Sequence, residues 1–255
     1  MKETAIVDST ALKQRFYKYL KENNIWWSPE RLNYSLGLLF QGFYLRGKDV
    51  LEIGAGHGLF SIWCAAQGAN KVVAIEPEAK GATQGIQQEF RKVNDAVDIE
   101  GKVEYMPSTI EDYLAIGQIK SFDYILMNAV INHLDEEATI RLHLPEAESA
   151  RQRYRSIFKK IFDIMRRDGV MLIYDVGRLN FWHSLKIRNM FAPSIEYNKH
   201  QQPQQWGELL RECGFELIDI RWITLYKLRY LRCLLSHRLP AYFLDSAFIL
   251  RCRKP

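Results

Sequence analysis

Asp49-Val-Leu-Glu-Ile-Gly-Ala-Gly-His-Gly-Leu-Phe60, followed by Lys71-Val-Val-Ala-Ile-Glu76, is the stretch that decides the fold. The apolar residues before the glycines predict a strand that is buried on both faces, and the apolar run before Glu76 predicts a second one. Between them, the glycines start a loop that leads into a packed helix. A strand, a glycine loop, a helix and a strand in this order predict a nucleotide-type pocket, because open parallel sheets bind ligands at the carboxyl ends of their strands.

The spacing of the glycines limits the classes of ligand that the pocket is expected to bind. A dinucleotide fingerprint is Gly-x-Gly-x-x-Gly, whereas here Gly54 and Gly56 are followed by Gly58, one position early. Glu52 lies beside the loop, where its carboxylate would repel a pyrophosphate. A cationic ligand with a ribose fits better, since Glu52 can face the positive group and Glu76 can accept hydrogen bonds from two ribose hydroxyls. S-adenosylmethionine has both parts.

This motif resembles that of the class I S-adenosylmethionine-dependent methyltransferases, in which an acidic residue precedes Gly-x-Gly-x-Gly. The resemblance extends over nearly the whole chain. It implies an α/β fold with a doubly wound, mostly parallel seven-stranded sheet whose last strand is antiparallel, and S-adenosylmethionine as the cofactor. It also implies a single methyltransferase domain over residues 46–255, with an acceptor-side insertion at about 176–204 and an N-terminal helical extension or lid over residues 1–45.

Hydrophobic periodicity outlines the remaining elements. The extension is expected to be helical, because Leu12, Phe16, Tyr17 and Leu20 share one face and Trp26, Trp27, Tyr34, Leu36 and Leu39 follow; it either covers the active-site mouth or patches the edge of the sheet. The other expected elements are helices over 83–93 and 154–165, strands over 102–106, 122–128 and 170–174, a helix from Trp206 that ends before Gly214, and strands over 217–222 and 246–252.

Composition excludes several classes of protein. The chain has 255 residues, a net charge of +5 and four cysteines that form no Cys-x-x-Cys, so we expect neither a disulfide framework nor a zinc site. No run approaches the roughly 18 apolar residues of a membrane span. The N-terminus lacks the apolar core of a secretory signal, which favours a cytoplasmic protein. Nothing in the sequence indicates the oligomeric state.

Three further residues are expected to support the cofactor. Thr109 and Ile110 match the family's adenine-contacting loop, and Asn128 ends the expected fourth strand. Ser108 and Glu111 have capping-box spacing, so a helix should begin there, and capping alone would explain Ser108.

Candidate catalytic residues follow the fourth and fifth strands. His133 is the expected general base, because an imidazole accepts protons near neutral pH, and Asp175 is its expected helper, either orienting His133 or taking the proton itself. Arg178, Asn180 and His200 are expected to line the acceptor site. Each has a plainer interpretation: His133 as a cap, Asp175 as a turn residue and His200 as a structural residue.

The residues near His133 indicate the chemistry. Some family members bind a divalent cation through two glutamates and a histidine here, but this chain has Ala129 and Asn132 at the matching positions, so no metal is expected. Members that methylate amino groups often carry Asn-Pro-Pro-Tyr, which Asn128-Ala-Val-Ile does not match. We therefore expect methylation of a hydroxyl on a small molecule or saccharide. The alternatives are an RNA or protein methyltransferase and a catalytically silent cofactor-binding subunit.

Two basic segments could bear on partners. One face of the expected helix over 154–165, with arginines just before it, is rich in Arg and Lys, which usually marks solvated surface, and nucleic acid is an unlikely partner. Residues 225–244 combine arginines with bulky apolar side chains. This segment either touches an acidic membrane surface or connects the last two strands, with long basic side chains covering apolar surface.

Overall fold

The computed structural model describes residues 9–23, 28–78, 85–99, 101–116 and 121–255. The chain divides into two compact units, Met1–Ile116 and Gly117–Pro255, which are described separately. Trp26 and Trp27, which were expected to follow the first helix, lie outside the described residues.

Unit 1 contains three parallel strands, β1 (Asp49–Ile53), β2 (Lys71–Ile75) and β3 (Val103–Met106), in the order β3-β2-β1. Helix α3 (Leu59–Ala66) follows the glycine loop, and all of its residues are buried because it packs against these strands. Helices α4 (Ile86–Val97) and α5 (Ile110–Ala115) complete the connections. The strand–loop–helix–strand arrangement predicted from the sequence is confirmed.

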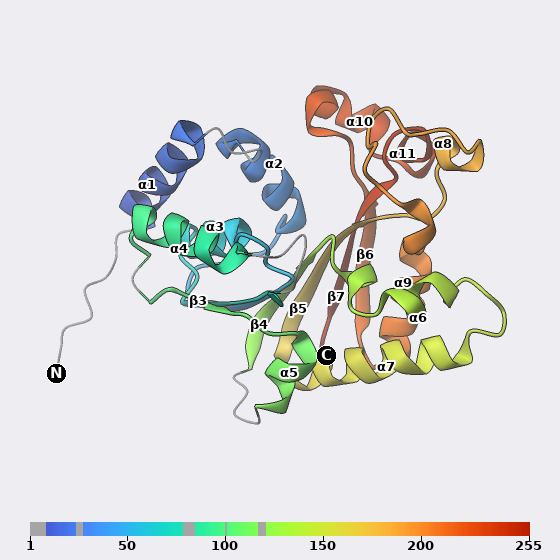
Figure 1. Cartoon of the computed structure of the whole chain (residues 1–255), viewed down its shortest axis with the longest axis horizontal. Helices are drawn as coiled ribbons and strands as arrows, with labels where there is room; N and C mark the ends of the chain where they lie inside the picture. The colour runs from blue at the N-terminus through green and yellow to red at the C-terminus, as the bar shows by residue number, and fades with distance from the viewer. Residues whose placement is uncertain (1–8, 24–27, 79–84, 100, 117–120) are drawn as a thin grey trace. The chain divides into compact units, whose positions relative to one another are not determined.

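The N-terminal residues form α1 (Ser9–Glu22) and α2 (Pro29–Leu39). Helix α1 packs on α3 and α4 and buries Leu12, Phe16 and Leu20, while Tyr17 stays half-buried (Figure 1). The predicted apolar stripe is therefore correct. Asn33 of α2 links α1 to α3, because its side-chain oxygen accepts hydrogen bonds from the Tyr17 hydroxyl of α1 and the Trp63 indole of α3. A lid role for this extension stays a prediction.

Unit 2 contains β4 (Phe122–Asn128), β5 (Met165–Val176), β6 (Glu216–Trp222) and β7 (Ala247–Arg253). Strands β4 and β5 are parallel, and β7 lies between β5 and β6 and runs antiparallel to both (Figure 1). The strand order of the sheet is β3-β2-β1-β4-β5-β7-β6. The predicted fold class is thus confirmed, including the antiparallel last strand.

Two longer helices support the sheet of unit 2. Helix α7 (Glu148–Asp163) carries the predicted apolar stripe, and α9 (Pro203–Glu212) packs on β6 and β7. Their contact is aromatic: the ring centroids of Trp206 and Tyr154 are 4.9 Å apart.

The shorter elements of unit 2 were not predicted. They are η1 (Ile131–His133), α6 (Glu136–Arg141), α8 (Phe181–Ser184), η2 (Tyr197–Lys199), η3 (Tyr226–Leu231), α10 (Arg232–Leu235) and α11 (Arg238–Phe243). Within the described ranges, no helix is long and apolar enough to cross a membrane.

Candidate active site

The glycine loop of unit 1 is held in a tight turn by its own backbone. The backbone N–H groups of Gly54 and Ala55 both donate to the Ile75 carbonyl, at 2.9 and 3.0 Å, and the N–H of Gly58 donates to the Ala55 carbonyl at 2.8 Å. Gly56 has φ +51° and Gly58 has φ +70°, in the left-handed region that residues with a Cβ rarely occupy. The loop therefore returns the chain from the end of β1 into α3.

Glu76 closes this loop from the end of β2. Its Oε2 accepts a hydrogen bond from the Gly56 N–H at 2.9 Å, so the carboxylate is fixed directly beside the turn. A Cβ on Gly56 would meet no heavy atom of the described structure within 4 Å. From the other side, the Tyr105 hydroxyl donates to the Gly56 carbonyl at 3.0 Å, and the Tyr105 ring stacks on Phe90. The Glu76 carboxylate and the open Cβ side of Gly56 therefore lie next to each other.

Glu52 is buried on β1 below the loop. The Ser61 hydroxyl of α3 donates to its Oε2 at 2.5 Å. Burial raises the pKa of Glu52 to about 8, and the nearby negative charge of Glu76 adds to the rise. At neutral pH Glu52 therefore holds a proton, which an approaching cation would help to expel.

This shifted acid predicts a pH dependence of stability. Between pH 4.5 and about 8, the unfolded chain releases the Glu52 proton while the folded chain keeps it, so the free energy of unfolding falls as pH rises. Glu52→Gln removes this contribution. We expect the difference in free energy of unfolding, wild type minus variant, to decrease over that pH window in urea titrations. A difference that stays flat with pH would show that Glu52 is not protonated in the folded state.

Gly58 serves the packing of unit 1. A Cβ at this position would lie 2.5 Å from Cδ2 of Phe90, whose ring is buried in α4. Gly58→Ala should therefore lower the free energy of unfolding by about 2 kcal/mol or more, from the positive φ and the overlap together. Gly37→Ala in α2 is the matched control, because its Cβ would meet no atom of the described ranges within 4 Å. Thermal melting tests the pair, and equal melting temperatures for the two variants would contradict this account.

Thr109 and Ile110 begin α5 in unit 1. The Thr109 hydroxyl caps this helix by accepting from the Asp112 N–H at 3.1 Å, and the Ile110 side chain is buried. The cap is therefore Thr109 and not Ser108, whose hydroxyl instead donates to the Thr109 carbonyl at 3.0 Å. The capping-box prediction was wrong by one residue. A contact between these residues and the cofactor stays a prediction.

In unit 2, polar side chains gather where β4 and β5 end. Asn128 ends β4 opposite Tyr174, and Asp175 follows Tyr174 on β5. Ala129 then adopts φ +53°, which turns the chain sharply toward η1. A residue with a side chain costs roughly 1 kcal/mol or more in this conformation, and such strain tends to concentrate at functional sites.

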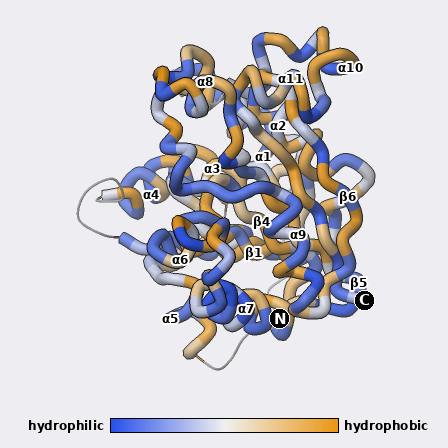
Figure 2. The backbone as a smooth tube through the Cα atoms, turned by 90° about the vertical axis from the view of Figure 1, so that its right-hand side faces the viewer, coloured by the Kyte–Doolittle hydropathy of each residue, from blue (hydrophilic) through white to orange (hydrophobic). Residues whose placement is uncertain are grey.

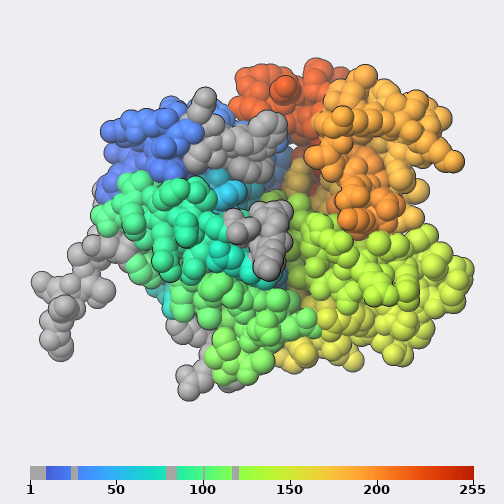
Figure 3. Space-filling model, viewed as in Figure 1, coloured from blue at the N-terminus to red at the C-terminus, as the bar shows by residue number. Residues whose placement is uncertain are grey.

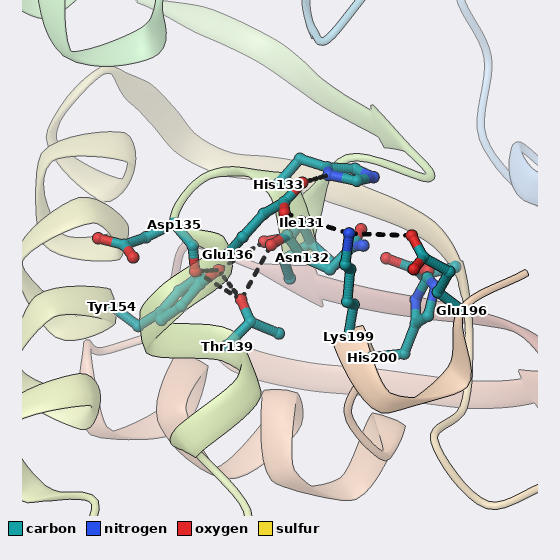
Figure 4. Close-up of polar contacts among 11 residues, drawn as sticks. Ile131, Asn132, His133, Asp135, Glu136, Thr139, Tyr154, Glu196, Lys199 and His200 are labelled. Carbon is teal, nitrogen blue, oxygen red and sulfur yellow. Dashed lines mark hydrogen bonds and ion pairs between the residues drawn. The ribbon is translucent and has the colours of Figure 1, made fainter.

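His133 lies on η1 and faces an acidic neighbour. Its Nδ1 is 2.6 Å from Oε1 of Glu136, whose other oxygen lies 3.6 Å from the Lys199 ammonium (Figure 4). The His133 side chain is 50 % exposed. Lys199 also pairs with Glu196 at 2.9 Å, so His133 ends a chain of surface charges.

Asp175 contacts a different histidine. Its Oδ1 lies 3.0 Å from Nδ1 of His200, and the two side chains are 1 % and 12 % exposed. The same oxygen accepts from the Val176 N–H at 2.6 Å. The expected contact between Asp175 and His133 is therefore not formed, because the His133 ring instead contacts Glu136, three residues further along the chain. The structure instead brings together Asp175 and His200, two residues that the sequence placed in separate roles.

Buried polar atoms near this pair have no partner. Both side-chain atoms of Asn132 are buried without a hydrogen-bond partner among the described residues, as are Oδ2 of Asp175 and Oε1 of Gln201. Such groups are costly when unsatisfied, which favours a site that a polar ligand completes. Asn132 was considered in the sequence only as a poor metal ligand, and its burial on the short helix η1 could not be read from hydrophobic periodicity.

A hydrogen-bond network holds the loop that carries these groups. The hydroxyl of buried Tyr154 donates to the Ile131 carbonyl at 2.9 Å, and the Thr139 hydroxyl lies 2.9 Å from the Asn132 carbonyl (Figure 4). Gln201 reaches the same loop, since its Nε2 donates to the Thr139 carbonyl at 2.5 Å. Helix α7 and the segment after η2 thereby fix the position of Asn132.

Two predicted acceptor-binding residues have structural partners. Asn180 is fully buried: its amide donates to the Tyr242 and Leu244 carbonyls, both at 3.1 Å, and its oxygen caps α8. Its polar atoms are thus used within the protein, and a contact with an acceptor stays a prediction. Nη1 of Arg178 donates to the Asn198 carbonyl at 2.5 Å, and its Nη2 lies 3.4 Å from Nε2 of His143.

No metal cluster accompanies these residues. In the part of the chain that the structure describes, no three His, Cys, Asp or Glu side chains converge as a metal ion would require. Metal independence stays a prediction.

The fold and the glycine loop define a Rossmann-like α/β protein of the nucleotide-binding type. A family model described as "Methyltransferase domain" matches residues 28–220. The chain belongs to this methyltransferase domain family, and the resemblance seen in the sequence is confirmed.

Similar proteins act on different acceptors. Protein arginine N-methyltransferase 6 of Danio rerio is 27% identical over 210 residues, covering 77% of this chain and 56% of that protein, so the chain spans about half the length of this relative. A ubiquinone biosynthesis O-methyltransferase of Neisseria meningitidis is 22% identical over 191 residues, covering 72% and 70%. A SAM-dependent methyltransferase structure from Aquifex aeolicus superposes with a TM-score of 0.58 at 11% identity, covering 93% and 98% of the two chains.

Proposed function

We propose that this chain transfers a methyl group from S-adenosylmethionine to a hydroxyl of a small molecule or saccharide. The observation that supports the choice of cofactor is the contact between Glu76 and the Gly56 N–H, together with the open space on the Cβ side of Gly56 among the described residues. Membership of the methyltransferase domain family supports it. In this proposal, Glu76 accepts hydrogen bonds from two ribose hydroxyls.

The other residues predicted to bind the cofactor are part of this proposal. Gly54 and Gly56 allow the backbone to approach the cofactor, and Gly58 is proposed to complete the loop that holds it. Glu52 faces the positively charged end, where the cation favours its ionised form. Thr109, Ile110 and Asn128 are proposed to support the adenosyl part.

The proposed acceptor site is the set of polar groups at the ends of β4 and β5. Methyl transfer from a sulfonium is an in-line displacement: an acceptor lone pair forms the bond to the methyl carbon while the carbon–sulfur bond breaks, leaving a neutral thioether. An acceptor hydroxyl must also lose its proton, so a nearby base accelerates the reaction. The Asn132 side chain and Oδ2 of Asp175 are buried without a hydrogen-bond partner among the described residues, and they are suited to hold that hydroxyl.

We assign the base to His200, with Asp175 as the residue that orients it. A buried carboxylate bonded to one imidazole nitrogen leaves the other nitrogen free to take a proton and stabilises the imidazolium that forms. His133 remains the second candidate, but it is half exposed and already paired with Glu136. Its position on the surface suits contact with the acceptor better than proton transfer in a protected site.

The basic face of α7 bears on the alternative RNA acceptor. Arg153 pairs with Asp135 at 2.8 Å, and Arg155 pairs with both Glu148 and Glu212. These ion pairs neutralise part of the charge that would attract phosphates. A hydroxyl of a small molecule or saccharide is therefore favoured over RNA, although the similar proteins include a tRNA methyltransferase and a protein arginine methyltransferase.

Two measurements test the proposal. Calorimetric titration with S-adenosylmethionine measures binding alone, and incubation with methyl-labelled cofactor measures transfer to phenols, sugars, total RNA and an arginine-rich peptide. Binding with transfer to a hydroxyl compound is expected. Binding without transfer to any acceptor favours the silent subunit, transfer to RNA or peptide contradicts the acceptor class, and no binding contradicts the whole proposal.

A further inference from the structure

Exposed apolar side chains concentrate on two segments of unit 2. Fifteen large apolar residues are exposed among the described residues, and ten of them lie within residues 178–191 and 226–243. They include Tyr230 at 82 %, Leu234 at 72 % and Met190 at 68 % exposure. Single exposed apolar residues are ordinary, but such a concentration marks a surface that binds something.

These two segments form one continuous surface. The Trp182 indole donates to the Phe243 carbonyl at 2.8 Å, and the rings of Phe181 and Phe243 lie 4.9 Å apart. Figures 1 and 2 show α8, α10 and α11 gathered at the same end of unit 2, and Figure 3 shows the two segments at the molecular surface in orange and red. We call residues 178–191 and 226–243 together the basic apolar surface.

All formal charge on this surface is positive. Residues 177–195 and 223–244 contain no Asp or Glu, whereas they hold seven Lys and Arg residues, namely Arg178, Lys186, Arg188, Lys227, Arg229, Arg232 and Arg238. Among the described residues, Lys227, Arg232 and Arg238 form no ion pair. The surface therefore combines cations that lack an ion-pair partner among the described residues with exposed apolar side chains.

A cavity of about 320 Å³ opens within this surface. It is lined by Leu179, Gln202, Trp222, Arg238, Leu239 and Tyr242. Its walls are mostly apolar, and Arg238 supplies a cation at the wall. Nε2 of Gln202 is buried without a partner in the described structure. The cavity thus fits a chain or ring that carries an anionic group.

We propose that the basic apolar surface binds the interface of an anionic lipid bilayer. Aromatic and aliphatic side chains enter the boundary between headgroups and acyl chains, while Lys and Arg attract anionic headgroups. A second copy of this chain is disfavoured, because a two-fold contact would bring like charges together. Nucleic acid would leave the aliphatic side chains unused.

The test is co-sedimentation of the whole chain with lipid vesicles. Vesicles of phosphatidylcholine containing about one-third phosphatidylglycerol should bind the protein at least tenfold more tightly than pure phosphatidylcholine vesicles. The difference should shrink as salt rises, since salt screens the charges over roughly 10 Å or less. Vesicle binding and its salt dependence are both measured without methyl transfer, so their outcomes are independent of the proposed function.

Paired variants locate the effect. Lys227→Glu with Arg232→Glu should abolish the preference for anionic vesicles, and Leu234→Ser with Leu239→Ser should weaken binding at least fivefold. The controls are Lys159→Glu with Lys160→Glu on α7, and Ile116→Ser in unit 1, which change exposed residues elsewhere. Unchanged melting temperatures verify folding.

Three results would overturn the proposal. They are equal binding to both kinds of vesicle, equal losses in the control variants, and self-association of the wild type in light scattering that the Leu234 and Leu239 changes abolish. The last result would assign the surface to contact between copies of the chain.

Discussion

Replacing Glu76 with alanine should weaken binding of S-adenosylmethionine by a factor of roughly 10 to 100, or about 1.5–3 kcal/mol. The change removes the proposed acceptor of two ribose hydroxyls, and it also releases the Gly56 N–H that this carboxylate holds at 2.9 Å. Calorimetric titration measures the effect directly and needs no knowledge of the methyl acceptor.

Glu104→Ala is the matched control for this variant. Glu104 is an acidic residue on the neighbouring strand β3, where it pairs with Lys71 at the surface. Its loss changes the net charge by the same amount without touching the glycine loop. If both variants bound the cofactor as the wild type does, Glu76 would have no place in the pocket.

His200→Ala should lower turnover by roughly a hundredfold or more while leaving cofactor affinity unchanged, because general base catalysis contributes about 10²–10⁴ to a rate. Asp175→Asn should also lower turnover, since the amide no longer stabilises a protonated imidazole. The two losses should not add when the variants are combined, because both residues act on one proton transfer.

His133→Ala distinguishes the two histidines. If His200 is the base, this variant should lose much less turnover, and added imidazole should partly restore the His200→Ala enzyme without affecting the His133→Ala enzyme. The reverse pattern would make His133 the base, as the sequence first indicated. Normal turnover in both variants would leave positioning of the acceptor as the whole mechanism.

The parts of the fold that could be predicted from the sequence are those with local signals. Strand β4 has the bounds expected from its apolar run, and the order of β1, the glycine loop, α3 and β2 follows from adjacent residues. Short helices such as η1, α6 and α8 span only one or two turns, which is too short for a helical period to appear. Thr109 and Ser108 are both good caps, so the local pattern could not decide between them.

The candidate site was predictable to the same degree. Glu52, Glu76 and the glycines lie within one strand–loop–helix–strand segment, so their meeting follows from the fold. Asp175 and His200 lie 25 positions apart in the sequence, and the segment between them includes α8 and η2. Their contact depends on how that irregular segment returns to the sheet, and no local pattern encodes this path. Both residues were therefore predicted from the sequence, but Asp175 was paired with His133, which follows the neighbouring strand.

The position of β7 has a consequence for synthesis on the ribosome. Residues 247–253 separate β5 from β6, so β6 has no neighbour in the sheet until this last strand has left the exit tunnel. Each residue of β7 pairs with a residue of β5, the strand that ends in Asp175 and Val176. The edge of β5 therefore stays unpaired until β7 has been synthesised, and an unpaired strand edge favours aggregation of the nascent polypeptide.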